Sequence, residues 1–520
     1  MERLDDATRH AYRSAFRQAV ADGQAKPLLI PYSVLGAFIV PALWLTIPHT
    51  HRPWLYQTRW LVVAFVVLFN INVARQSSST NMACAYAAGL MASWGVVLNM
   101  NLLVWKRPQF EAARAIRVLR KATHERTDST LASATSPQTS HGLRSRNIGV
   151  PTAGPRTQEF ESMTDAELSR SRQDISFQYP DFADAYKRAG WNWSISSIPR
   201  PKIPAKTRLG DRVDLNSMPR VTGSGYERCL TERQFIRKHV VKILIMYCIL
   251  DLLSVSMMMD PYFIHGPDNA SELPRHLQRL SPWVIIAYRE LLCLSGVLAA
   301  LDAVFAVNNV VQYWLFKTLW PSRAALWHYS STFGSFSLVL DKGLAGWWGD
   351  WWHQTFRQQF LAPSLYLQRR GYLREGSQTA AAVAMFLSFF QSGLLHAFGS
   401  MSSIPETRPW RSPLFFLLQV AGISIQDGLA KVMKRRVPNP PRMLTRIANF
   451  LFTFVWMYAT STLFIDDISS SGLWLLEPVP ISPLRWLGYG HPTDHWWRWD
   501  RDHFPKWHSG AHWWETGIAL

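Results

Sequence analysis

The sequence predicts an all-α, polytopic integral membrane protein with about eight transmembrane helices and one or two interfacial or re-entrant helices. Mostly uncharged runs of roughly 18 to 25 residues recur along the chain, and about 20 residues at the helical rise cross the hydrocarbon core of a bilayer. Basic loops separate these runs, so the mean hydropathy of −0.05 averages over two kinds of segment. The 520 residues, 48% of them hydrophobic, would suffice for two or three soluble domains, but this segregation favours one membrane domain.

The apolar runs fix the expected order of elements along the chain. The fifth run is long enough to be tilted or to hold two elements, and 325–340 is a weaker candidate for a span. Residues 1–26 are charged and amphipathic and lack the apolar core of a signal peptide, so the first run is expected to direct insertion. The predicted spans are 28–48, 55–73, 81–104, 239–259, 283–314, 378–400, 411–433 and 443–465.

Five segments follow from these spans. Within the polar insertion, 122–160 is rich in Ser, Thr, Pro and Arg and is expected to be disordered. Residues 163–172 could form a short helix with a capping box of Thr164 and Glu167. The segments are an N-terminal amphipathic segment (1–27), three transmembrane helices (28–104), a basic, partly disordered cytosolic loop (105–238), a transmembrane core that would hold the site (239–470) and an aromatic-rich interfacial tail (471–520).

The net charge of +19 raises the alternative of a nucleic-acid-binding protein. The basic residues lie mostly in loops that flank apolar runs, where they set topology and meet anionic headgroups, so we expect membrane lipid and no nucleic acid as partner. Lys and Arg dominate both ends of the loop 105–238, and the positive-inside rule places it in the cytosol. The loop 260–281 is then luminal, and its sequon at Asn269 is the expected glycosylation site, whereas the sequon at Asn192 would be cytosolic and unmodified.

The spacing of cysteines and histidines gives little support for a metal site. Three of the four cysteines fall within predicted spans, and no disulfide framework or CxxC pattern is present. His491/His495 and His508/His512 have the i, i+4 spacing of zinc ligands on a helix, but Pro492 indicates a turn, and the interleaved Trp and Arg favour an interfacial segment without metal. The absence of Gly-rich phosphate loops in the sequence weighs against nucleotide hydrolases and dinucleotide oxidoreductases.

The stretch 346–357, GWWGDWWHQTFR, holds four tryptophans, a histidine and an arginine. As a helix it would stack Trp347 on Trp351 and Trp348 on Trp352, and place His353 one turn from Arg357. One interpretation is an interfacial helix with tryptophans at headgroup level and Arg357 reaching lipid phosphates. The other is one wall of a functional site.

His396 is the single ionisable group in the apolar stretch SFFQSGLLHAFG. A lone histidine is often a hydrogen-bonded core residue, but ionisable groups inside a membrane are rare and tend to mark function. Other polar residues lie in or near spans, and none of them is expected to act in catalysis: Asp251, Arg289, Glu290, Asp302, Gln426 and Asp427. Arg289–Glu290 and Asp302 are expected to make structural pairings between helices.

These two elements resemble motifs of the wax synthase branch of the membrane-bound O-acyltransferase superfamily. Residues 347–354 (WWGDWWHQ) are similar to its FWG-x-x-WH element, with Trp347 where Phe is commoner and Asp350 where Arg is usual, and 392–396 (SGLLH) match its second element. The aromatic GWNW at 190–193 resembles a motif of fungal members that acylate secondary metabolites. The resemblance covers roughly residues 180–470 and implies an enzyme that acetylates a hydroxyl of an apolar, terpenoid or meroterpenoid acceptor.

The resemblance also implies roles for residues. His396 would be the catalytic base, and His353 would orient the acceptor or donate to the oxyanion. Trp348, Trp351 and Trp352 would line the channel for the acyl chain and pantetheine. Acyl-CoA, expected as acetyl-CoA, would be a co-substrate and not a permanently bound cofactor. Its phosphates should meet cationic groups, for which the candidates are Arg357, Arg369, Arg370 and Arg374. The alternative for each of these arginines is a place in a solvated or lipid-facing basic loop.

Two alternatives remain open from the sequence. A long-chain-alcohol O-fatty-acyltransferase, which makes wax esters, would use the same residues on another acyl length. A membrane transporter would use the two histidines as buried polar groups, although no internal repeat of the kind found in transporters is visible. The endoplasmic reticulum is the expected location of the multi-pass chain.

Overall fold

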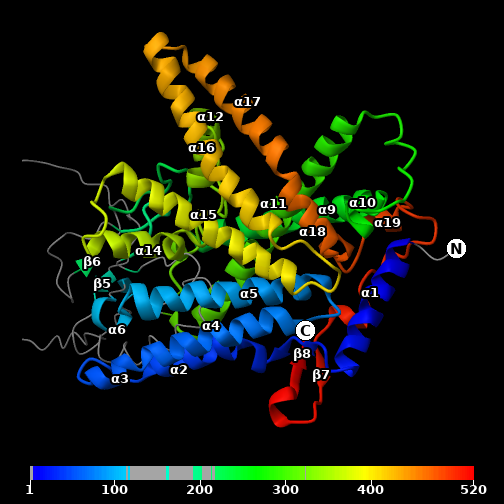
Figure 1. Ribbon diagram of the computed structural model, residues 1–520, viewed down its shortest axis with the longest axis horizontal. Coiled ribbons are helices and arrows are strands. Elements are labelled where there is room, and N and C mark those ends of the chain that lie inside the picture. The colour runs from blue at the N-terminus through cyan, green and yellow to red at the C-terminus, as the bar shows by residue number, and fades with distance from the viewer. Residues whose placement is uncertain are drawn as a thin grey trace, which may run out of the picture.

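The computed structural model describes residues 4–112, 115–117, 160–162, 191, 193–201, 212–213, 217–321 and 324–520. Its long helices lie side by side and make up almost all of the described regular structure, which confirms the all-α prediction (Figure 1). Apart from 160–162, the stretch predicted to be disordered (122–160) and the short helix predicted at 163–172 lie outside the described residues.

Six helical segments in the described part of the chain are long and apolar enough to cross a membrane. A seventh span exists if α17 and α18, which meet at a bend of 43°, count as one. All seven coincide with predicted apolar runs, and their outward faces expose large apolar side chains such as Leu61, Leu244 and Val304, as lipid-facing helices do. The spans are α3–α4 (Pro53–Gln57, Arg59–Gln76), α5 with its π-helical end η3 (Met82–Met100, Asn101–Trp105), α9 (Glu232–Met257), α11 (Pro282–Leu319), α15 (Gln378–Met401), α16 (Arg411–Arg436), and α17–α18 (Arg442–Thr460, Thr462–Ser470).

The first predicted span, 28–48, is not a full span. Its helix comprises η1 (Tyr32–Val34), η2 (Leu35–Ile39) and α2 (Val40–Thr46), and 15 residues extend only about 22 Å, short of the roughly 30 Å core. The residues before it pair in a sheet instead, because β2 (Leu29–Ile30) binds β8 (Gly517–Ala519). The weaker candidate 325–340 is also wrong as a span, since it holds only η6 (Leu326–His328) and the start of α12 (Ser337–Lys342).

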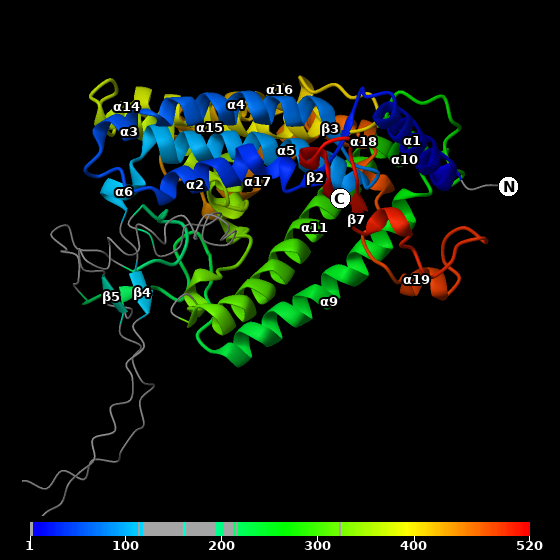
Figure 2. The same ribbon diagram turned by 90° about the horizontal axis from the view of Figure 1, so that it is seen from below.

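Helix α11 is continuous over 38 residues, so the alternative of two elements in this run is wrong. At about 57 Å it exceeds the hydrocarbon thickness and must tilt or extend beyond it. Figure 2 shows α9 beside α11 along much of its length, the pair diverging from the layer of α4, α5 and α15.

The two ends of the bundle differ. Figure 1 places α3, the strands β5–β6 of the polar insertion and α14 (Arg357–Arg369) at one end, and α1 (Leu4–Ala21), α10 (Pro261–His265), α19 (Pro483–Trp486) and the β7–β8 hairpin at the other. The remaining described elements are short: β1 (Lys26–Pro27), β3 (Ser77–Ser78), α6 (Pro108–Glu111), β4 (Ala115–Arg117), β5 (Phe160–Ser162), β6 (Arg212–Val213), α13 (Leu344–Gly346), η7 (Trp347–Trp351), η8 (Leu473–Leu475), η9 (Arg501–His503), β7 (Lys506–His508) and η10 (Trp513–Glu515).

The amphipathic helix α1 is held by a buried ionic cluster. Glu477, whose side chain is 1% exposed, lies within 3.1 Å of Arg485, 2.5 Å of Arg498 and 3.5 Å of Arg9. Arg9 also donates to the main-chain oxygen of Leu475. Helix α1 therefore packs its basic side chains against the segment after α18 instead of presenting all of them to solvent.

Helices α5, α15 and α16 approach closely through glycines. A Cβ on Gly89 of α5 would collide with the main-chain oxygen of Phe398 in α15, and one on Gly393 would lie 2.5 Å from Pro413 in α16. Because the backbones come this near, the last turns of α15 are enclosed between α5 and α16. His396 lies in this enclosed part.

Candidate functional site

The aromatic segment 346–357 is not one helix. Helix α13 (Leu344–Gly346) continues into one π-helical turn, η7 (Trp347–Trp351), and the backbone then becomes extended at Trp352 (φ −61°, ψ 150°). Helix α14 begins only at Arg357, so His353 lies in the break between two helices. The predicted helical relation between His353 and Arg357 is therefore wrong, because the widened π turn ends the hydrogen-bond pattern before His353.

The predicted aromatic pairs are present in spite of this break. The ring centroids of Trp347 and Trp351 lie 4.4 Å apart, and those of Trp348 and Trp352 lie 5.7 Å apart. The turn keeps the indoles in one cluster, and Phe333 stacks on Trp351 from the outside. The cluster thus forms a wall, as the sequence predicted.

Polar contacts hold the break in place. Burial raises the pKa of the Tyr226 phenol, which stays protonated and donates to the main-chain oxygen of Trp352 at 2.7 Å. Arg357 donates to the main-chain oxygen of Gly349 and, at 2.6 Å, to Gln354 Oε1. Asp350 pairs with Lys342 at 2.8 Å. These hydrogen bonds of the Arg357 guanidinium to Gly349 and Gln354 are thus made within the motif itself.

His396 is enclosed by aromatic rings. Its imidazole stacks on Phe416 at 5.3 Å with an interplanar angle of 10°, and Phe464 meets it edge-on at 4.9 Å. Tyr86 Oη lies 3.4 Å from His396 Nδ1. These three neighbours come from α16, α18 and α5, so four helices position one imidazole.

Phe416 connects the two motifs. The Trp348 ring lies 5.7 Å from Phe416, on whose ring His396 also stacks. His353 lies 5.4 Å from the ring of Trp352, and its Nδ1 is 3.2 Å from Thr355 Oγ1. The structure therefore brings the tryptophan cluster and His396 together across one shared phenylalanine, with His353 beside Trp352 of the same cluster.

Two carboxylates on α18 were not predicted from the sequence, and one of them contacts α15 one turn after His396. Asp467 is fully buried and accepts hydrogen bonds from Ser400 Oγ at 3.0 Å and from the Arg408 main-chain N–H at 2.9 Å. Asp466 accepts from Tyr262 Oη at 2.8 Å. Two adjacent carboxylates in the apolar run TLFIDDISS were the available signal, because such groups are rare within spans.

The polar residues expected to pair between elements do so. Arg289 makes a bidentate contact with Asp260 at 2.8 and 2.9 Å, and Asp302 on α11 pairs with Lys242 on α9 at 2.8 Å. Glu290 accepts a hydrogen bond from Ser461 at 2.6 Å. These groups are satisfied by their neighbours, in keeping with structural roles.

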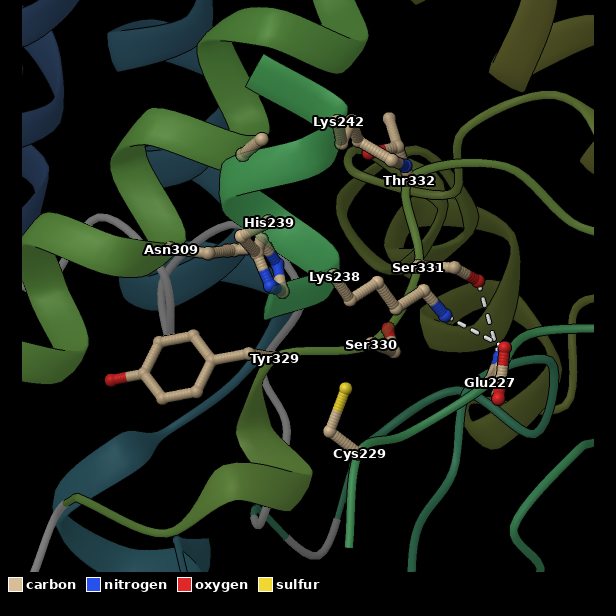
Figure 3. A pocket seen from close by; sticks show the side chains of 11 residues that line it. Glu227, Cys229, Lys238, His239, Lys242, Asn309, Tyr329, Ser330, Ser331 and Thr332 are labelled. Atoms are coloured by element: carbon tan, nitrogen blue, oxygen red, sulfur yellow. Dashed lines mark hydrogen bonds and ion pairs between the residues drawn. The ribbon is translucent and has the colours of Figure 1, made fainter. Parts of the chain in front are cut away.

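A separate polar pocket lies between α9, α11 and the segments 227–229 and 329–332 (Figure 3). Lys238 crosses it to Glu227 at 2.7 Å, and Lys242 is paired with Asp302. His239 lies beside Asn309, with His239 Nε2 3.2 Å from Asn309 Nδ2. Neither His353 nor His396 lines this pocket, and each of its two lysines is paired with a carboxylate.

The aromatic motif at 190–193 is described only in part. The rings of Trp191 and Trp193 stack at 5.2 Å with an angle of 3°, and the Lys106 ammonium lies 4.4 Å from the centre of the Trp193 ring. Asn192 lies outside the described residues. Lys106 follows span α5–η3, so this motif is held at the end of the bundle where the polar insertion begins.

In the tail, the two histidine pairs with zinc-ligand spacing, His491/His495 and His508/His512, do not lie on helices that would bring each pair together. His491 Nδ1 lies 2.8 Å from Thr493 Oγ1, and His495 Nδ1 accepts from the Trp497 main-chain N–H at 3.0 Å. His508 ends a short strand. The turn around Pro492 separates His491 from His495, and the end of β7 separates His508 from His512.

Comparison with known proteins identifies relatives. Residues 329–418 match the model of the membrane bound O-acyl transferase family. The chain is 32% identical over 161 residues to "Acetyltransferase pyr8" of Aspergillus fumigatus, covering 30% of this chain and 37% of that protein. It is 27% identical over 162 residues to "Acetyltransferase aurG" of Calcarisporium arbuscula, covering 31% and 39%. It is 25% identical over 256 residues to "O-Mevalon transferase macI" of Penicillium terrestre, covering 46% and 49%.

These matches span between about a third and a half of the relatives' own lengths. No solved structure matches the chain. The family match contains both the WWGDWWHQ and the SGLLH motif, which the structure joins through Phe416. The resemblance of this chain to the membrane-bound O-acyltransferases is thereby confirmed over residues 329–418.

Proposed function

We propose that this protein is a membrane-bound O-acyltransferase that moves an acetyl group from acetyl-CoA to a hydroxyl of an apolar acceptor, a terpenoid or meroterpenoid intermediate of secondary metabolism. The observation that carries the proposal is the position of His396, an imidazole held among aromatic rings within an apolar helix of the family-matched segment. Relatives named as acetyltransferases support acetyl as the acyl group. Another relative is named as an O-mevalon transferase and not as an acetyltransferase. Transfer of a long-chain acyl group to form a wax ester stays the second candidate.

The chemistry requires no covalent nucleophile, because the thioester is already activated. His396 would take the proton of the acceptor hydroxyl as its oxygen bonds to the thioester carbonyl carbon. The carbon–sulfur bond then breaks, the imidazolium returns the proton to the CoA thiolate, and an ester and free CoA leave. The buried indole N–H groups of Trp347 and Trp348 have no hydrogen-bond partner among the described residues, so they join His353 as possible donors to the carbonyl oxygen.

The donor would enter from the end of the bundle that carries the basic insertion, which we assign to the cytosol. Arg369, Arg370 and Arg374 are exposed there, between α14 and α15. Arginines at this mouth suit the phosphates of CoA, because guanidinium and phosphate form paired, charge-assisted hydrogen bonds. Arg357 would instead support the site by bracing the motif.

In the test, microsomes that contain the wild-type protein are given labelled acetyl-CoA or labelled long-chain acyl-CoA, together with a panel of terpenoid and fatty alcohols. Ester formation and release of free CoA are measured together, with and without acceptor. The proposal expects CoA release that depends on the acceptor and is faster with acetyl-CoA. Faster turnover of the long-chain donor would favour the wax ester function, whereas no acceptor-dependent CoA release from well-expressed protein would favour the transporter.

Asn269 is proposed as a luminal glycosylation site in the endoplasmic reticulum. It lies in the loop between α10 and α11, at the end of the bundle opposite the polar insertion. Endoglycosidase is expected to increase the gel mobility of the wild type but not of Asn269→Gln. If Asn192→Gln rather than Asn269→Gln removed the shift, the proposed orientation would be inverted.

A further inference from the structure

Tyr86 contacts the proposed catalytic base from another helix. It lies on α5, more than 300 positions before His396 in sequence, and is 5% exposed. Its Oη lies 3.4 Å from His396 Nδ1 and 3.4 Å from the main-chain oxygen of the same residue. One phenol thus faces both the side chain and the backbone of His396.

Helix α15 leaves space for this phenol. Gly399 follows His396 by three positions, on the same side of the helix. A Cβ at Gly399 would lie 2.8 Å from Cε1 and 2.9 Å from Cζ of Tyr86, too close for any side chain. The Tyr86 ring therefore packs directly on the helix backbone, and its hydroxyl reaches the imidazole because position 399 has no side chain.

We propose that Tyr86 is a positioning residue that sets the tautomer and orientation of His396; this inference rests on the proposed acyltransferase function. The Tyr86 hydroxyl donates to the His396 main-chain oxygen and accepts from the Nδ1–H. The Nε2 atom is then unprotonated and can take the acceptor's proton. Once the imidazolium forms, the same phenol oxygen still accepts the Nδ1–H. Contacts of this length in a protein without substrate tighten in the reacting complex.

The neighbours of the imidazole support this assignment. Phe416 covers one face of the ring and Phe464 meets it edge-on, and neither can accept a hydrogen bond of ordinary strength from Nδ1. Tyr86 is the polar side chain for which the structure records a contact with His396 Nδ1 in the described part of the chain. A base with two interchangeable tautomers needs such a partner, because only one of them presents a lone pair at Nε2.

The test compares Tyr86→Phe with the wild type in the microsomal ester assay. We expect kcat to fall about tenfold to a hundredfold, the range for loss of a group that orients a functional histidine, with KM for acyl-CoA and acceptor within twofold. Gly399→Ala should lower kcat in the same way, since its Cβ displaces the phenol. The matched controls are Tyr458→Phe, whose hydroxyl donates to the Trp283 main-chain oxygen at 2.9 Å, and Gly428→Ala, where a Cβ meets nothing within 4 Å.

A double variant separates positioning from general damage. If Tyr86 acts through His396, Tyr86→Phe should cause no further loss in a His396→Ala background. A Tyr86→Phe variant with kcat within twofold of wild type, while His396→Ala is inactive, would overturn the inference and leave the proposed function standing. Full activity of His396→Ala would instead remove the proposed base, and Tyr86 with it. An additive loss in the double variant would mean that Tyr86 supports the fold alone.

Discussion

His396→Ala is expected to lower the rate of ester formation by about a hundredfold or more, with the amount of folded protein unchanged. General base catalysis contributes roughly 10²- to 10⁴-fold, and the described part of the site offers no second imidazole on the Phe416 side of the tryptophan cluster. The ring's neighbours are mainly aromatic, so its removal breaks few polar contacts. Initial rates at saturating acetyl-CoA, normalised to the protein level in the membrane, measure the loss.

The matched control is His10→Ala, which removes an exposed imidazole from α1. It should leave the rate unchanged. His353→Ala should have an intermediate effect that includes a raised KM for the acceptor, because this histidine is proposed to orient the acceptor. An undiminished rate for His396→Ala at equal expression would contradict the mechanism.

Glu477→Gln is expected to destabilise the fold by about 3 to 5 kcal/mol, the usual effect of removing one partner from a buried ionic group. Glu477 receives hydrogen bonds from Arg485 and Arg498, and all three side chains are at least nine-tenths buried. The substitution keeps the shape but leaves the arginine charges without their central carboxylate. Unfolding of the detergent-solubilised protein at pH 7 measures the loss.

The effect of Glu477→Gln should depend on pH. Burial alone would raise the pKa of Glu477, but the hydrogen bond from Arg498 and the surrounding arginine charges lower it to about 2. Because the folded pKa lies below the unfolded value, the carboxylate's contribution is complete above about pH 4.5 and is lost as the pH falls toward 2. The difference between variant and wild type should therefore shrink in acid.

The control for this prediction is Asp427→Asn, which removes an exposed i, i+4 pair with Lys431. Such pairs contribute only about 0.3 to 0.5 kcal/mol, so its stability should match that of the wild type. If Glu477→Gln were as stable as this control at pH 7, the cluster would not hold α1 in place.

Much of the fold follows from local composition. Six predicted runs coincide with helices in the described part of the chain that are long enough to span a membrane, and a seventh does so if α17 and α18 count as one span, because an apolar run of sufficient length has few alternatives in a membrane. The prediction of a full span over 28–48 was wrong because the helix begins only after Pro31, and residues 29–30 pair with a strand near residue 518. No pattern within the run itself predicts a partner so far along the chain.

In the candidate site, too, contacts within one segment could be predicted from the sequence, whereas contacts between distant segments could not. The predicted tryptophan pairs are present, since spacing along one segment governs those contacts. The break at Trp352 was not predicted, because the 3.6-residue period of an α-helix does not anticipate a π turn. Tyr86 and Asp467 reach His396's surroundings from α5 and α18, and only tertiary packing determines such contacts.

The ionic cluster around Glu477 has a consequence for biosynthesis. Arg9 and Leu475 are 466 positions apart, yet they share a hydrogen bond beside that cluster. At about 5 to 20 residues per second, a ribosome needs roughly 25 to 90 s between the two. During this time helix α1 lacks its contacts with Leu475 and Glu477, while the spans are being inserted. The contacts of α1 with this cluster can form only after the spanning helices have been synthesised, so membrane chaperones have that interval to act on α1.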